Sequence, residues 1–85
     1  MDLGLKGKTA LVVAASKGMG KASAMGLAQE GARVAMCARG EVDLKAAAEE
    51  VRQKTGADVL AIPADASKLE DITRVVGQVN EKWGG

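Results

Sequence analysis

Short apolar runs alternate along the chain with longer stretches whose apolar residues recur every three or four positions. The predicted strands are residues 8–14, 33–38 and 58–63, and the predicted helices are residues 19–30, 42–55 and 68–82. The strands are continuous apolar runs, whereas the longer stretches have helical periodicity. The order βαβαβα is typical of parallel strands joined by right-handed crossovers in an α/β domain.

Particular residues refine these elements. The first strand is an uninterrupted apolar run, so we expect it to be covered on both faces. Gly31 and Gly56 follow two of the helices, where glycine commonly ends a helix. Pro63 lacks an N–H group and favours an edge position for the third strand. In the second helix, the residues at helical offsets are Leu44, Ala47, Ala48, Val51 and Thr55.

The third helix has the clearest pattern. Ser67 and Glu70 match a capping box, in which the two side chains bond to each other's backbone N–H groups. We expect a single buried face on this helix. Its residues are Leu69, Ile72, Val76, Val79 and Trp83.

Length and composition narrow the classes of function. The chain has 85 residues, 12 basic and 11 acidic, so we expect one small domain with little net charge. The chain has no block of basic residues of the kind that binds nucleic acid. It also has no apolar run long enough to span a membrane, so we expect a cytoplasmic protein. Without histidine, neither a catalytic triad nor a histidine-containing metal site can form. The single cysteine, Cys37, lies in an apolar run and is expected to be buried and inert.

A glycine-containing turn separates the first strand from the first helix. Gly18 and Gly20 remove side chains where a phosphate would approach the backbone, and the helix start offers N–H groups. A Walker loop is excluded because Ala15 and Ala22 replace its glycine and hydroxyl residue. Ser23 breaks the G-x-G-x-x-G fingerprint, and the paired acids of a receiver domain are absent. The turn therefore predicts nucleotide binding of another type.

The spacing of residues 14–20, Ala-Ala-Ser-Lys-Gly-Met-Gly, resembles the G-x-x-x-G-x-G turn of the short-chain dehydrogenase/reductase family. The resemblance covers residues 29–34, 64–67 and 82–85 as well, and is greatest to 3-oxoacyl-[acyl-carrier-protein] reductases. Ala14 replaces the family's first glycine, which bears on the tightness of the turn. The resemblance implies that residues 1–85 form an N-terminal dinucleotide-binding half-domain of the Rossmann type.

That family's doubly wound sheet has strand order 3-2-1 in its first half, and we expect this chain to end before the fourth strand. The first two helices should cover one face of the sheet and the third helix part of the other. The first strand would be left as an apolar edge, through which we expect self-association into a homo-oligomer.

The cofactor expected from the resemblance is NADP(H). No carboxylate lies between Glu30 and Glu41, where NAD-binding proteins usually hold the ribose 2′-hydroxyl. Lys17 and Arg39 would instead pair with a 2′-phosphate, although both could simply be solvated surface charges.

The resemblance also assigns roles beyond the 2′-phosphate. Asp65 and the Ala66 amide would contact the adenine, and the alternative for Asp65 is a local turn or helix-entry role. Ser16 would contact the ribose or phosphate, or cap the turn. The complete expected cofactor-binding set is Ala14, Ser16, Lys17, Gly18, Met19, Gly20, Arg39, Asp65 and Ala66.

The reaction implied by the resemblance is hydride transfer between nicotinamide and a small carbonyl or alcohol substrate. The family's catalytic tyrosine cannot lie in this chain, which contains no Tyr, so we expect the 85 residues alone to be inactive. Two alternatives are a non-catalytic βαβαβα module that binds a nucleotide or protein, and a structural half-domain that dimerises.

Overall fold

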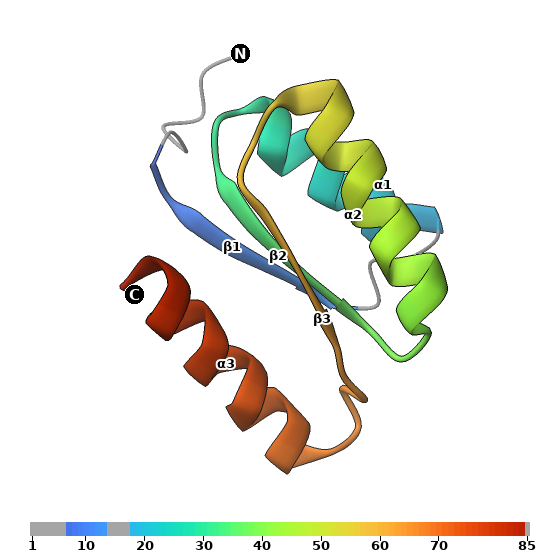
Figure 1. Cartoon of the computed structure of the whole chain (residues 1–85), viewed down its shortest axis with the longest axis vertical. Coiled ribbons are helices and arrows are strands. Elements are labelled where there is room, and N and C mark those ends of the chain that lie inside the picture. The colour runs from blue at the N-terminus through green and yellow to red at the C-terminus, as the bar shows by residue number, and fades with distance from the viewer. Residues whose placement is uncertain (1–6, 14–17, 85) are drawn as a thin grey trace.

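The computed structural model describes residues 7–13 and 18–84, and the fold consists of three strands alternating with three helices (Figure 1). The elements are β1 (Thr9–Val13), α1 (Gly18–Gln29), β2 (Arg33–Ala38), α2 (Glu41–Thr55), β3 (Val59–Pro63) and α3 (Leu69–Trp83). All strands are parallel in one sheet of order β1-β2-β3. The predicted fold class and strand order are confirmed. Ala14, Ser16 and Lys17 lie outside the described residues.

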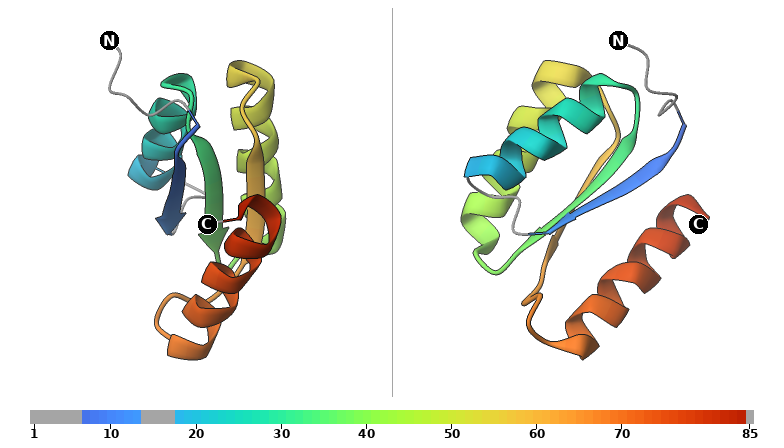
Figure 2. Two further views of the ribbon diagram at one scale, coloured as in Figure 1. Left: turned by 90° about the vertical axis from the view of Figure 1, so that its left-hand side faces the viewer. Right: turned by 180° about the vertical axis from the view of Figure 1, so that it is seen from behind.

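Two helices cover one face of the sheet, as predicted. Figure 2 shows α1 and α2 on the same side of the strands and α3 on the opposite side. The core beneath α1 and α2 is built around fully buried Val34, Met36, Leu44 and Val51. The helical offsets predicted for α2 are confirmed at its four buried residues, Leu44, Ala47, Ala48 and Val51. Gly56 ends α2 in the left-handed conformation, with φ 72°.

The opposite face of the sheet carries a smaller core under α3. Ala35 and Cys37 of β2, Ile62 of β3 and Val75 and Val79 of α3 form its buried cluster. Cys37 is completely buried, as the sequence predicted. The helix therefore rests on β2 and β3.

The position of α3 makes two sequence predictions wrong. Leu11 and Val13 of β1 are 39% and 42% exposed, because α3 packs over the other two strands. The strand is thus covered on one face only. Leu69 and Val76 are also exposed, at 81% and 45%, and Val75 is buried in their place. The buried stripe of α3 is rotated relative to the predicted one.

The predicted capping box is wrong as well. Lys68 is the N-cap of α3 and makes no side-chain capping hydrogen bond. The Ser67 hydroxyl instead donates to Oδ1 of Asp65, at 2.7 Å. A side chain engaged with the preceding turn cannot serve the helix start.

The two edges of the sheet differ in their protection. β3 is an edge strand, as Pro63 predicted. Arg52 of α2 donates to the Val59 carbonyl at 2.8 Å, and Arg74 of α3 donates to the Pro63 carbonyl at 2.9 Å. Asp58 and Ala64 bond to β2, so the odd-numbered residues between them direct their backbone groups outward. Arginines from both helices therefore occupy outward carbonyls of β3.

Within the described residues, no helix has the combination of length and apolar character needed to cross a membrane.

Candidate functional site

The candidate site lies at the carboxyl ends of the three strands. In open parallel sheets, ligands bind in the crevice outside these ends. The main-chain N–H of Ala64 donates to the Ala38 carbonyl at 2.9 Å, which ties the end of β3 to the end of β2. The start of α1 follows β1 at the same end of the sheet (Figure 1). Each residue of the candidate site that the structure describes follows a strand or begins α1.

The first helix begins with features suited to an anion. Gly18 has φ +57°, which L side chains rarely adopt, and a Cβ built there would meet no atom within 4 Å. The first turn of α1 contains no acidic residue, whereas α2 has Glu41 and Asp43 there. A helix start carries free N–H groups and a positive dipole end that favour negative charge. Within the described residues, the start of α1 therefore has the features that favour an anion.

Arg39 and Asp65 follow the neighbouring ends of β2 and β3, where Ala38 and Pro63 are register partners. The pKa of the Asp65 carboxyl is held below its ordinary value, chiefly by the hydrogen bond from the Ser67 hydroxyl. The Ser67 N–H acts in the same direction, and the charges of Arg39 and Lys68 add to both, while desolvation opposes them. Arg39 itself is exposed. Both residues therefore lie at the carboxyl edge of the sheet, and the charge of Arg39 reaches the Asp65 carboxylate.

Asp65 also forms a local turn, which is the alternative role expected from the sequence. Its Oδ1 accepts from the N–H of Ser67 at 2.9 Å and from the Ser67 hydroxyl. Its carbonyl accepts from the N–H of Lys68 at 3.0 Å. Among the described residues, no donor contacts Oδ2, so one carboxylate oxygen is available to a ligand. Ala66, inside this turn, is exposed.

Two residues of α3 also fix this turn, and sequence reasoning missed both. The Asp65 N–H donates to Oδ2 of Asp71 at 2.7 Å. Arg74 lies 3.9 Å from Oδ1 of Asp71 while it donates to the Pro63 carbonyl. The sequence signal for Asp71 is an acidic residue in the first turn of a helix, a feature too common to single it out.

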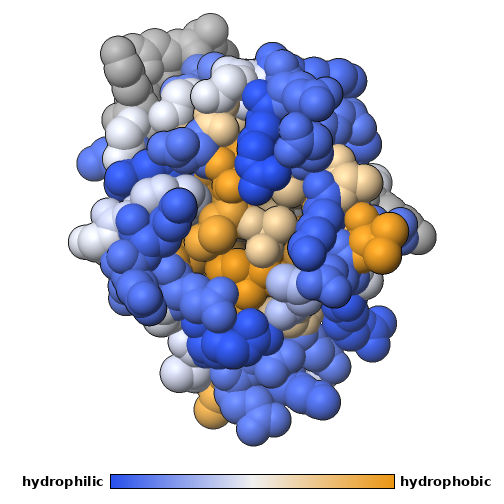
Figure 3. Space-filling model, in the orientation of Figure 1, coloured by the Kyte–Doolittle hydropathy of each residue, from blue (hydrophilic) through white to orange (hydrophobic). Residues whose placement is uncertain are grey.

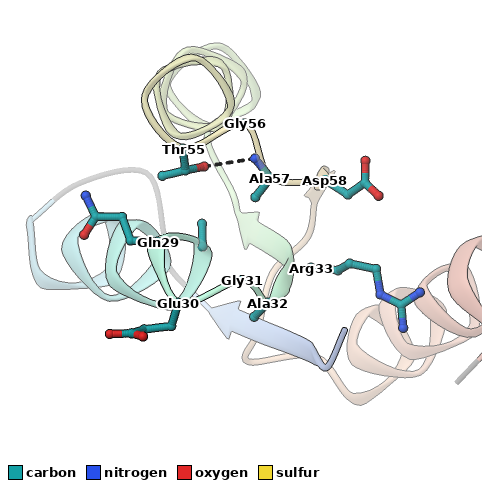
Figure 4. Close-up of a pocket in the computed structure, with 10 residues that line it drawn as sticks. Gln29, Glu30, Gly31, Ala32, Arg33, Thr55, Gly56, Ala57 and Asp58 are labelled. Atoms are coloured by element: carbon teal, nitrogen blue, oxygen red, sulfur yellow. Dashed lines mark hydrogen bonds between the residues drawn. The ribbon is translucent and has the colours of Figure 1, made fainter. Parts of the chain in front are cut away.

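A separate groove of about 620 Å³ lies at the other end of the molecule. Its lining comes from the ends of α1 and α2 and the segments that follow them, residues 28–33 and 55–58 (Figure 4). The hydrogen bond from the Ala57 N–H to the Thr55 hydroxyl stabilises one wall. This groove adjoins the amino ends of β2 and β3, opposite to the end where parallel sheets bind ligands.

Metal binding has no support in the part of the chain that the structure describes. No group of three or more Asp, Glu, Cys or His side chains is placed to hold an ion there.

The three parallel strands and their helices define a βαβαβα unit of the Rossmann type. Among known proteins, the family profile of short chain dehydrogenases matches residues 8–85. The chain is 37% identical over 78 residues to 11-beta-hydroxysteroid dehydrogenase A of Sesamum indicum, covering 92% of this chain and 22% of that protein. The chain belongs to the short-chain dehydrogenase family.

Solved structures agree with this assignment. L-sorbose reductase of Gluconobacter frateurii, complexed with NADPH and L-sorbose, has a TM-score of 0.95 and 38% identity, covering 100% of this chain and 32% of that one. An NAD⁺-bound xylitol dehydrogenase has a TM-score of 0.88 and 30% identity, covering 94% of this chain and 30% of that one. The chain thus spans less than a third of the length of these relatives.

Proposed function

We propose that this chain binds NADP(H) at the carboxyl ends of its strands, as the cofactor-binding part of a short-chain oxidoreductase. The observation that carries the proposal is that Arg39 and Asp65 follow the register-paired ends of β2 and β3, at the edge of the sheet where α1 starts without an acidic residue. A cation and a carboxylate at neighbouring strand ends match the phosphorylated ribose and the adenine of one nucleotide. Membership of the family and the NADPH complex of L-sorbose reductase support the same cofactor.

The described residues fit such a cofactor chemically. The acid-free start of α1 suits a diphosphate, and apart from its chain neighbours no described atom lies within 4 Å of the position where a Cβ of Gly18 would be. No carboxylate lies between Glu30 and Glu41, so a 2′-phosphate would meet no repulsion at the end of β2. Oδ2 of Asp65 suits the adenine amino group, which is a donor.

Each residue then has a defined task. Arg39 and Lys17 pair with the 2′-phosphate, and Asp65, with the Ala66 amide, orients the adenine. Gly18, Met19 and Gly20 open α1 toward the diphosphate, with Ala14 and Ser16 in the preceding turn. The cofactor supplies hydride chemistry when bound, and the protein supplies its position.

The substrate that we propose is a small carbonyl or alcohol, of which a 3-oxoacyl thioester is one example. L-sorbose reductase, with L-sorbose bound, supports a small oxygenated substrate. The 85 residues contain no tyrosine to serve as the acid expected for this family, so we propose that they do not catalyse the reaction alone. We further propose a cytoplasmic homo-oligomer for the working enzyme.

Calorimetric titration of the chain with NADPH and NADH tests the cofactor assignment. We expect NADPH to bind at least about tenfold more tightly, because two partly exposed charge-assisted contacts contribute roughly 1 kcal/mol each. Arg39→Ala should reduce this preference several-fold while weakening NADH little. Arg52→Ala removes an arginine of α2 that bonds the Val59 carbonyl, and it should leave the preference intact. Equal affinity for the two cofactors would contradict the roles of Lys17 and Arg39.

A second candidate function rests on the exposed side of β1. Leu11 and Val13 are 39% and 42% exposed on an edge strand, and such edges recruit other chains. The chain would then act as a non-catalytic module that self-associates through β1. Sedimentation over a range of concentrations tests this function, which requires a dimer that Leu11→Lys dissociates. The cofactor titration separates the two candidates, because a non-catalytic self-associating module needs no preference for NADPH.

A further inference from the structure

The turn that carries Asp65 is held by two side chains that act on different parts of it. Ser67 holds the carboxylate, since its N–H and hydroxyl both donate to Oδ1. Asp71 holds the main chain, since its Oδ2 accepts the Asp65 N–H at 2.7 Å. With both in place, the carboxylate of Asp65 is fixed in position as well as in direction.

The contact from Asp71 is itself anchored. Arg74 is 3.9 Å from Oδ1 of Asp71, and the same guanidinium donates to the Pro63 carbonyl at 2.9 Å. One turn of α3 thereby reaches the last residue of β3 and the residue two positions beyond it. The side chain of Asp71 is only 26% exposed, so its hydrogen bond is partly sheltered from water.

We infer that Asp71 is a positioning residue for adenine recognition, acting through the main chain of Asp65. This inference rests on the proposed function, in which Oδ2 of Asp65 accepts from the adenine amino group. Asp71 does not touch the nucleotide. Without its carboxylate, the Asp65 N–H loses its acceptor, the turn relaxes, and Oδ2 moves out of reach of that amino group.

The test compares NADPH with nicotinamide hypoxanthine dinucleotide phosphate, in which an oxygen replaces the adenine amino group. The chain should bind NADPH roughly five- to tenfold more tightly than this analogue, the range for one partly exposed hydrogen bond to a charged group. Asp71→Ala should reduce that ratio to less than about twofold. The NADPH-to-NADH ratio should not change, because it depends on the 2′-phosphate at the end of β2.

Two further variants separate positioning from general destabilisation. Asp71→Asn keeps an oxygen that can accept the Asp65 N–H, so it should restore most of the amino-group preference. Glu70→Ala removes the adjacent acidic residue from the same first turn of α3 and should leave the preference at the wild-type value. Amide hydrogen exchange at Asp65 gives a second readout, and it should be at least about tenfold faster in Asp71→Ala than in either control.

The outcomes distinguish the inference from the function on which it rests. If the wild-type chain does not distinguish the analogue from NADPH, or binds neither, the adenine role of Asp65 fails, and the role of Asp71 fails with it. If the wild-type chain discriminates and Asp65→Ala abolishes the preference, the proposed role of Asp65 holds. In that case, two results for Asp71→Ala would overturn the inference about Asp71 alone. One is an unchanged ratio of NADPH affinity to hypoxanthine-analogue affinity, and the other is an equal loss of affinity for NADPH and for the analogue.

Discussion

The guanidinium of Arg33 lies over the indole ring of Trp83, with 5.6 Å between Cζ and the ring centroid. Arg33 begins β2 and Trp83 ends α3, so the contact fastens the far end of that helix to the sheet. Nη2 of Arg33 also donates to the Gly7 carbonyl at 3.2 Å and to the Thr9 hydroxyl at 3.1 Å. In Figure 4, Arg33 extends away from Gln29 and Thr55, the residues on the other side of the groove. A single side chain thus connects β1, β2 and α3.

Removal of this side chain should destabilise the fold. We expect Arg33→Ala to lower the free energy of unfolding by about 1–2 kcal/mol, through one cation–π contact and two hydrogen bonds. Urea denaturation followed by fluorescence measures the change, because Trp83 is the only tryptophan. Arg39→Ala, at the opposite end of β2, serves as the control. An unchanged midpoint for Arg33→Ala would show that the contact contributes nothing.

Two glycines of the same helix should respond to alanine in opposite ways. Gly18 has φ +57° and open space where a Cβ would lie, so Gly18→Ala is opposed by backbone strain alone, about 1–2 kcal/mol. Gly26 lies inside α1, where a Cβ also meets nothing. We expect Gly26→Ala to raise stability by about 0.5–1 kcal/mol. Thermal unfolding of both variants tests this, and destabilisation by both would mean that another contact dominates.

Adjacent valines of α3 provide a matched pair. Val75 is fully buried against β2 and β3, while Val76 is 45% exposed. We expect Val75→Ala to cost about 2 kcal/mol through lost burial and a small cavity. Val76→Ala should change stability by no more than about 0.5 kcal/mol. Chemical denaturation distinguishes the two, and a larger cost for Val76→Ala than for Val75→Ala would mean that the sequence-predicted helix face is the one that packs in solution.

Acid should weaken the attachment of α1 to α2. The pKa of Glu50 is lowered by hydrogen bonds first from Lys21 of α1 and then from Lys54 of α2. A carboxyl with a lower pKa in the folded state stabilises the fold above its unfolded pKa, and this contribution is lost as the pH falls through the folded pKa. We expect the wild-type free energy of unfolding to fall below about pH 4.3, the ordinary glutamate value.

Glu50→Gln isolates this effect. The variant should be less stable than the wild type at pH 7, and the difference should shrink as the pH is lowered toward 3. Glu49→Gln is the matched control, because Glu49 pairs with Arg52 inside α2 and makes no bridge to another helix. A difference between wild type and Glu50→Gln that stays constant with pH would contradict the role of the Lys21–Glu50 pair.

The order of elements could be predicted from the sequence because it depends on local periodicity, and the strand order followed from the resemblance of the glycine turn to that of the short-chain dehydrogenases. The exposure of Leu11, Leu69 and Val76 could not, because it depends on which strands α3 covers. Any rotation of a helix about its axis keeps the same spacing of apolar residues. The residues of the candidate site also divide into those that local sequence predicts and those that depend on tertiary structure. Arg39 directly follows β2 and Asp65 is two residues beyond the end of β3, whereas the link from Asp65 to Asp71 depends on the path of the intervening turn.

The arginine contacts at β3 make the two edges of the sheet unequal for the addition of a further strand. Arg52 and Arg74 occupy the Val59 and Pro63 carbonyls, and Pro63 has no N–H to offer. Apolar side chains gather along the middle of the face in Figure 3 and are bordered by polar ones. A strand approaching β3 would have to displace two guanidinium groups before it could form regular hydrogen bonds. Among the described residues, no side chain donates to a main-chain carbonyl within β1 itself, so a further strand is more easily added beside β1 than beside β3.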